Sequence, residues 1–144
     1  MSQRTVQQII EGQDPVTASP GISVSEAARL MKQHNIGAIM AVEDEKLVGV
    51  FTERDALFRV LAEGLNGDAT KLGSVMTRNP QTISPSAGFT TALQMMHDGR
   101  YRHLPVVDQG RVIGVVSVRD ALGPELEAFV YEMLREEQIQ EVLA

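Results

Sequence analysis

An internal repeat constrains the fold of this chain more than any other feature of its sequence. The string GVFTERDAL (residues 49–57) matches GVVSVRDAL (residues 114–122) at an offset of 65 residues. The same offset aligns VTASP (residues 16–20) with QTISP (residues 81–85) without a gap. Self-similarity at one fixed spacing is typical of a duplicated structural unit, so we expect two copies of one small fold.

Each copy is predicted to form a βαββα unit. A short stretch ends at a Ser-Pro pair, which interrupts regular structure. A helix follows, with Ser25 as the expected N-cap in the first copy and Thr90 in the second. Two apolar runs then predict buried strands, and a second helix is expected to begin at residues 53–55 in the first copy and 118–120 in the second. The predicted strands are AIMAV (38–42), KLVGVFT (46–52), HLPVV (103–107) and RVIGVVS (111–117).

The two copies are expected to share one core, because a unit of fewer than about 60 residues buries too little surface alone. We therefore predict an α/β fold in which the copies pack sheet to sheet. An amphipathic C-terminal helix should follow, with an apolar stripe of Leu126, Val130, Met133 and Leu134. The predicted division is an N-terminal segment (1–12), a first repeat (13–62), a linker (63–73), a second repeat (74–123) and the C-terminal helix (124–144).

The composition argues against several classes of function. The chain has 144 residues, no Cys and a net charge of −6. The lack of Cys removes disulfides, thiolate catalysis and Cys-based zinc sites, and no metal site is expected. From Glu125 onward six Glu accompany one Arg, which argues against nucleic-acid binding. The apolar runs are too short to span a membrane, and residues 1–14 lack a signal-peptide core, so we expect a soluble cytoplasmic protein.

The duplicated motif G-apolar-apolar-[Thr/Ser]-x-Arg-Asp carries recognisable binding chemistry. Its Gly lets another group approach the backbone closely. Its hydroxyl and carboxylate, Thr52 with Asp55 and Ser117 with Asp120, lie three residues apart across a strand-to-helix turn. A carboxylate can accept two hydrogen bonds from a ribose diol, and a hydroxyl beside helix N–H groups suits phosphate oxygens. Alternatively, these pairs only cap helices, but two copies with Arg before each Asp favour a ligand role.

Signatures of catalysis are absent from the sequence. It contains no G-x-G-x-x-G, P-loop or G-x-S-x-G motif. Ser117 has no His that the sequence places as its general base, and the Met residues at helical spacing are typical of core packing. We therefore expect a binding module rather than an enzyme.

Together these features resemble a CBS-domain pair, the regulatory module named after cystathionine β-synthase. The resemblance covers nearly all of residues 13–122 and rests on QTISP, on YRHLPVVD (residues 101–108) and on the two GVxTxRD-type strings. It implies two βαββα repeats in a disc-like module with pseudo-twofold symmetry. It also implies two clefts, each built from both repeats. Ligands of the family include AMP, ADP, ATP, S-adenosylmethionine and NAD-type dinucleotides.

The resemblance assigns seven residues to the cleft that holds a basic pair. The Asp that binds ribose and the neighbouring Ser/Thr are implied to come from the first repeat, and adenine and its surroundings are implied to contact the second. The residues are Thr52, Arg54 and Asp55 with Thr82, Arg102, His103 and Pro105. Because Arg54, Arg102 and His103 would form a cationic wall, we expect the phosphate of the ligand in this cleft.

A second cleft is implied by the same resemblance, with a weaker set of groups. Its residues are Thr17, Gly37 and Ala38 with Ser117, Arg119 and Asp120. The Gly37-Ala38 pair supplies no charge where the first cleft has Arg102-His103. In addition, Met40 stands where the family often has Pro. This cleft is therefore expected to be the weaker phosphate site.

The leading functional hypothesis is an adenine-nucleotide sensor that forms a homodimer and acts in trans on a regulated protein. Ligand binding would favour one arrangement of the repeats or of two modules in the dimer. One alternative is a structural scaffold with empty clefts, which a ligand-induced shift in melting temperature distinguishes. Another is a nucleotide-hydrolysing enzyme, which release of phosphate distinguishes.

Overall fold

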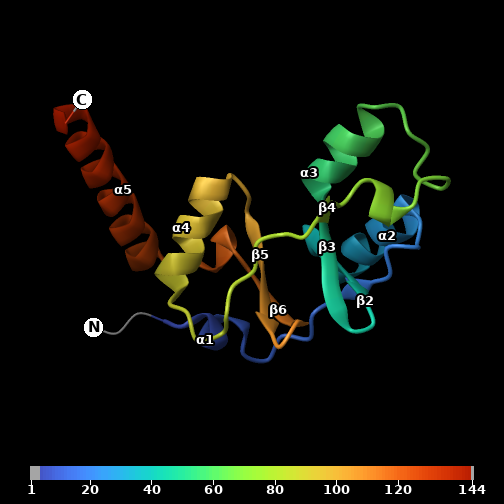
Figure 1. Ribbon diagram of the computed structural model, residues 1–144, viewed down its shortest axis with the longest axis horizontal. Coiled ribbons are helices and arrows are strands. Elements are labelled where there is room, and N and C mark those ends of the chain that lie inside the picture. The colour runs from blue at the N-terminus through green and yellow to red at the C-terminus, as the bar shows by residue number, and fades with distance from the viewer. Residues whose placement is uncertain (1–3, 144) are drawn as a thin grey trace.

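The computed structural model describes residues 4–143, which form two α/β lobes side by side with a long helix projecting from one end (Figure 1). The first repeat builds one lobe from β1 (Thr17–Ala18), α2 (Val24–His34), β2 (Ala38–Glu43), β3 (Lys46–Thr52), α3 (Glu53–Asp55) and the π-helical turn η1 (Ala56–Leu61). The second repeat builds the other from α4 (Phe89–Gly99), β5 (His103–Asp108), β6 (Arg111–Ser117) and the 3-10 turn η3 (Val118–Asp120). The remaining elements are α1 (Val6–Ile10), η2 (Leu72–Ser74), β4 (Thr77–Arg78) and α5 (Gly123–Leu143).

The duplication predicted from the sequence is confirmed in the strand pairing. In the first lobe β2 pairs antiparallel with β3, and β1 joins β2 in parallel. In the second lobe β5 pairs antiparallel with β6, and Ile83 forms a parallel bridge to Val106. The register of each hairpin also shifts at an equivalent position of the repeat, after Ala41 in the first lobe and after Val106 in the second. The two copies therefore share local geometry as well as topology.

The predicted helix caps are wrong in both copies. Helix α2 is capped by Ser23, whose hydroxyl accepts from the Glu26 backbone N–H at 3.1 Å. Ser25 lies inside the first turn, where its own N–H donates to the Gly67 carbonyl at 3.1 Å. Helix α4 begins after Gly88, with Thr90 in its first turn. Each helix starts two residues earlier than predicted, because Ser23 and Gly88 already adopt the extended conformation of an N-cap.

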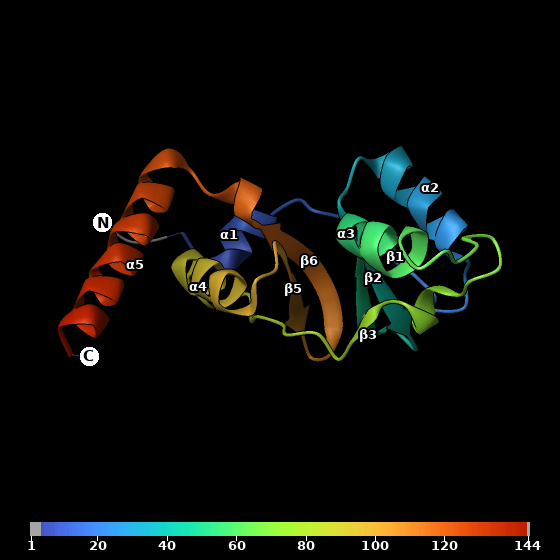
Figure 2. The ribbon, with the colours of Figure 1, turned by 90° about the horizontal axis from the view of Figure 1, so that it is seen from above.

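The segment that precedes each repeat packs in the lobe of the other repeat (Figure 2). Val6 and Ile10 of α1 are buried in the core of the second lobe, and the Val6 N–H donates to the Ala87 carbonyl at 2.8 Å. Leu72, which falls in the predicted linker, is buried in the first lobe, and its N–H donates to the Ile22 carbonyl at 2.8 Å. Neither lobe therefore has a complete core without a segment from elsewhere in the chain.

The glycine of each repeated motif permits this crossover. A Cβ atom added at Gly114 would lie 2.7 Å from the Cβ of Ile10, and one added at Gly49 would collide with the side chain of Met76. The close approach predicted at these glycines therefore exists. The approaching group is an apolar side chain of the crossing segment and not a ligand.

The two lobes meet through the sheet faces that point away from the helices. Ala38, Met40 and Val50 form a small buried cluster there, against Val112 and Val115 of β6. At one end of this contact the Leu47 N–H donates to the Gly110 carbonyl at 3.3 Å, and Glu45 pairs with Arg111 at 2.7 Å. Both faces of β2 and β3 are thus covered, as their near-continuous apolar sequence predicts.

The second repeat departs from the first after its motif. The predicted second helix is a single 3-10 turn, η3, followed by Ala121 in an extended conformation. Pro124 has no N–H to donate to the Asp120 carbonyl, which a continuing helix would need. That carbonyl accepts instead from Arg4 at 2.8 Å, and Arg4 also pairs with Glu125.

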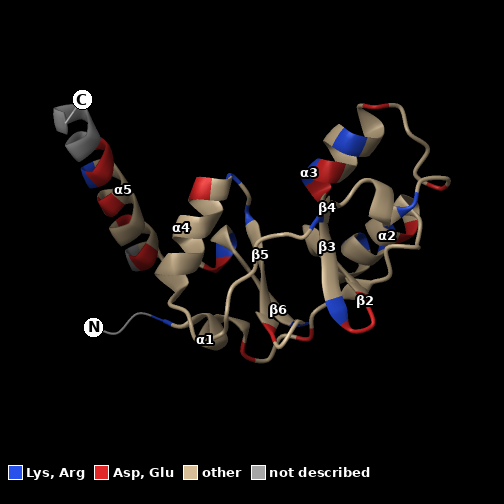
Figure 3. Cartoon of the chain, viewed as in Figure 1, with Lys and Arg blue, Asp and Glu red and all other residues tan. Residues whose placement is uncertain are grey.

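The C-terminal helix α5 extends away from the second lobe and carries many acidic side chains (Figure 3). Its Phe129 packs against α4, with its ring centroid 5.8 Å from that of His97. Three side chains of the predicted apolar stripe, Leu126, Val130 and Leu134, remain exposed. Within residues 4–143, helices of membrane-spanning length lack the sustained apolar character that crossing a bilayer requires.

We predict that Ile10→Ala destabilises the protein by about 2–5 kcal/mol, because it removes a buried side chain from the second lobe. Gln7→Ala, an exposed change on the same helix, is the matched control. Urea unfolding of both variants measures the difference. Equal stability of the two variants would contradict the exchange of segments between the lobes.

Candidate functional site

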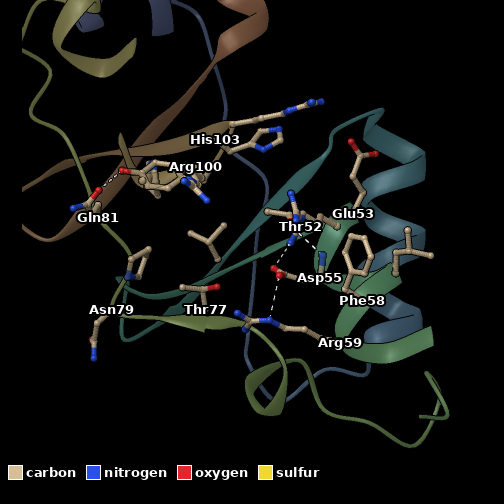
Figure 4. Close-up of a pocket in the computed structure, with 18 residues that line it drawn as sticks. Thr52, Glu53, Asp55, Phe58, Arg59, Thr77, Asn79, Gln81, Arg100 and His103 are labelled. Atoms are coloured by element: carbon tan, nitrogen blue, oxygen red, sulfur yellow. Dashed lines mark hydrogen bonds and ion pairs between the residues drawn. The ribbon is translucent and has the colours of Figure 1, made fainter. Parts of the chain in front are cut away.

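A cavity of about 920 Å³ lies at the seam between the two repeats (Figure 4). The first repeat supplies the end of β3, α3 and η1. Thr77 of β4, the strand that pairs with β3, extends this wall, and the opposite wall comes from residues 79–81 and from residues 99–105, which lead into β5. Four arginines line the cavity against two acidic groups, in a chain whose net charge is −6. The site is therefore locally cationic, which favours an anionic ligand.

The turn at Thr52 and Asp55 positions a carboxylate at the cavity. The Thr52 N–H donates to Oδ2 of Asp55 at 3.0 Å, and the Asp55 N–H donates to the Thr52 hydroxyl at 3.2 Å. The Asp55 side chain is 14% exposed. The two residues thus form a capping box, which confirms the alternative that they cap a helix. The cap does not prevent a second role in binding a ligand. An ionised carboxylate has about four acceptor positions, so the cap leaves capacity for further hydrogen bonds.

Arg59 completes the surroundings of this carboxylate, although it is not among the residues predicted from the sequence. Its Nε lies 3.4 Å from Oδ1 of Asp55, and its Nη1 donates to the Val75 carbonyl at 3.2 Å. The available signal was its spacing, since a cation four residues after an acid on a helix commonly forms an ion pair.

Arg54 is less available for contact with a ligand than its place in the motif suggests. Its guanidinium lies over the ring of Phe58, with 5.1 Å between the guanidinium carbon and the ring centroid. Both residues line the cavity. This cation–π contact keeps a cation and an aromatic face together at the edge of the site.

The opposite wall contains the basic residues of the second repeat. Arg100 and Arg102 line the cavity beside Tyr101, whose hydroxyl donates to Oε1 of Gln81. Arg100 caps α4 in the left-handed conformation, with φ of 59°, where the first repeat has Asn35 at 52°. An Arg is an unusual choice for this conformation, and the comparison of repeats was the signal that could have identified it.

His103 is half-buried and lines the cavity between the two repeats. A Cβ atom added at Gly37 would lie 3.2 Å from Nε2 of His103 and 3.2 Å from Oε1 of Glu53. Burial is the main cause that lowers the pKa of His103; Arg119 and Arg102 lower it further, whereas Glu53 and Asp120 act in the opposite direction. The imidazole is therefore mainly neutral at pH 7, and the cationic wall consists of arginines rather than of His103.

The structure brings together most of the first predicted set. Thr52, Arg54, Asp55, Arg102, His103 and Pro105 all line the cavity. Thr82 does not line the cavity, although its neighbour Gln81 does, so the prediction for Thr82 is wrong by one position. Pro105 is fully buried and contributes an apolar wall.

The second predicted set lies outside this cavity. Ser117 and Asp120 form the same turn as their counterparts, with the Ser117 N–H donating to Oδ2 of Asp120 at 2.7 Å. Ala38 is buried where the lobes meet, and Gly37 faces His103. Thr17 and Arg119 are exposed. Across residues 4–143, His, Asp and Glu side chains form no group of three or more that could hold a metal ion.

Comparison with known proteins identifies the family. The CBS domain model matches residues 6–62 and 72–124, so the chain belongs to the CBS domain family. The CBS domain-containing protein YhcV of Bacillus subtilis is 40% identical over 104 residues, which is 72% of this chain and 74% of that protein. The mitochondrial protein CBSX3 of Arabidopsis thaliana is 37% identical over 105 residues, and the match spans 51% of its length.

Solved structures agree with this assignment. The CBS domain pair of protein MJ0100, in complex with 5′-methylthioadenosine and S-adenosyl-L-methionine, is 30% identical with a TM-score of 0.74 and covers 83% of this chain and 93% of that one. The protein PAE2072 of Pyrobaculum aerophilum, in complex with AMP, has a TM-score of 0.79 at 22% identity and covers 89% and 99%. The latter likeness supports the fold alone. The predicted family and fold are thus confirmed.

The lowered pKa of His103 predicts a pH-dependent stability. Between the pKa of the folded protein and the unfolded value of about 6.5, the unfolded state binds more protons. The contribution of the neutral imidazole to the free energy of unfolding is therefore complete above about pH 6.5. This contribution is lost as the pH falls through the pKa that His103 has in the folded protein. Urea unfolding of the ligand-free protein from pH 7.5 to 5.5 should show wild type losing stability relative to His103→Gln. A difference between the two that is independent of pH would contradict this assignment.

Proposed function

We propose that the chain is a regulatory module that binds an adenine nucleotide in the cavity at the seam and is not itself an enzyme. The observation that carries this proposal is the placement of Asp55 beside a cavity whose opposite wall holds Arg100 and Arg102. A carboxylate on one side and guanidinium groups on the other match a ribose and its phosphate. The adenosine ligands of the MJ0100 domain pair support the same class of ligand.

The chemistry of the walls suggests an orientation for the nucleotide. The ribose hydroxyls donate to Asp55, and the phosphate lies toward Arg102. The base then lies against the apolar surfaces of Pro105 and Val50. AMP, ADP, ATP, NAD and S-adenosylmethionine share the adenosine part that this arrangement recognises.

Regulation follows from the position of the cavity between the repeats. A ligand that contacts both walls binds best to one spacing of the lobes, and it shifts the population toward that spacing. A partner protein that recognises this state would receive the signal in trans. We propose the cytoplasm as the compartment, in line with the absence of Cys from the sequence.

We further propose that the module acts as a homodimer. The exposed leucines Leu57, Leu61 and Leu65 follow one another along the first lobe, and Leu126, Val130 and Leu134 follow α5. A second copy of the chain would remove such apolar surface from water. Light scattering at micromolar concentration should give twice the chain mass of 15.7 kDa, and a mass of 15.7 kDa would contradict the dimer.

We predict that Asp55→Ala weakens AMP binding by about 10- to 100-fold, because each charged hydrogen bond contributes about 1.5–3 kcal/mol. Asp120→Ala is the matched control, since Asp120 forms the same turn outside the cavity. Calorimetric titration of AMP, with thermal unfolding of each variant to establish folding, measures both effects. If the two variants lose equal affinity, or if Asp55→Ala loses none, the proposed site is wrong. Release of phosphate from ATP by the wild type would instead favour an enzyme.

A further inference from the structure

Arg59 lies outside the repeated motif, yet it is the cation nearest to the carboxylate at the candidate site. We propose that Arg59 is a positioning residue, which holds Asp55 in the orientation that recognises the 2′- and 3′-hydroxyls of a ribonucleotide. This inference rests on the proposed function of the cavity. It adds the residue that fixes the orientation of the ribose-binding carboxylate.

The contacts of Asp55 support this role. One carboxylate oxygen, Oδ2, accepts from the Thr52 N–H at 3.0 Å, and the other, Oδ1, lies 3.4 Å from Nε of Arg59. A carboxylate held through both oxygens cannot rotate freely about its last side-chain bond. Each oxygen retains an acceptor position, so the pair can receive two hydroxyls at a fixed spacing.

Arg59 is itself held at a second point. Its Nη1 donates to the carbonyl of Val75 at 3.2 Å. Val75 belongs to the segment that crosses into the first lobe after the buried Leu72. The guanidinium therefore connects the carboxylate to the chain that joins the two repeats, and its planar fork suits two contacts in fixed directions.

The local backbone is specialised at this position. Arg59 lies in the π-helical turn η1, where the Ala62 N–H donates to the Leu57 carbonyl at 2.8 Å. Such turns are rare and occur frequently at functional sites. Figure 4 shows the result, with the Arg59 side chain directed across the turn toward Asp55.

The second repeat provides an internal comparison. Ser117 and Asp120 reproduce the turn, with a hydrogen bond of 2.7 Å. The position four residues after Asp120 is Pro124, which offers no donor. The repeats therefore share the carboxylate but not its positioning cation, and only the first carboxylate lines the cavity.

The experiment compares AMP with 2′-deoxy-AMP, which differ only in one ribose hydroxyl. Calorimetric titration of the full chain gives the ratio of the two affinities for wild type, Arg59→Gln and Arg59→Lys. Contributions of base and phosphate cancel in this ratio, so a loss of charge that weakens both ligands equally leaves it unchanged. Arg29→Gln is the matched control, because Arg29 is an exposed arginine of the same lobe whose ion pair with Asp68 lies outside the cavity.

We expect wild type and Arg29→Gln to prefer AMP by about tenfold or more. Arg59→Gln should reduce this preference at least fivefold, and Arg59→Lys, which retains the charge without the fork, should lie between them. If Arg59→Gln weakens both ligands but keeps the wild-type ratio, Arg59 supplies only charge and the inference is wrong, whereas the proposed function stands. If wild type binds neither ligand, the proposed function fails and the inference fails with it. Should Arg59→Gln not fold, the ratio in Arg59→Lys decides, and a wild-type ratio there overturns the inference.

Discussion

Neither repeat can bury its own sheet, and the rest of the structure depends on this constraint. Each sheet has one face against its own helix and the other against the opposite lobe. Each core is completed by a segment that precedes the other repeat, with Ile10 in one lobe and Leu72 in the other. The glycines of the repeated motif leave room for that segment. Since the motif also ends in the Thr52–Asp55 turn, the packing that joins the lobes places the carboxylate at their seam.

Duplication produced two similar turns, but the chain uses them differently. The first turn lines the cavity together with Arg102 and His103 of the other repeat, whereas the second turn lies outside that cavity. A helix follows the first turn and brings Arg59 to its carboxylate. In the second repeat the chain becomes extended at Ala121 instead of continuing as a helix, and α5 begins at Gly123. The cavity is consequently cationic on one side of a pseudo-symmetric module.

The sequence predicted the elements that depend on local patterns. The offset of 65 residues, the four central strands and the turn at Thr52 and Asp55 are all readable from residue type and spacing. Contacts between distant segments were not readable. The packing of α1 in the second lobe cannot be predicted without the structure of that lobe. Nor could the sequence show that Gln81 lines the cavity in place of Thr82, because the segment that contains them has no regular secondary structure from which side-chain positions could be predicted. The charge state of His103 likewise depends on burial, which one sequence does not reveal.

The central claim is that one nucleotide is held between the two repeats, at the cavity beside Asp55. Amide hydrogen exchange with and without AMP tests this most directly, because it reports on both walls and on the second turn in one measurement. The account predicts slower exchange in residues 50–59 of the first repeat and residues 100–105 of the second, with no change at residues 117–120. Protection confined to one repeat, or centred on Ser117 and Asp120, would contradict it.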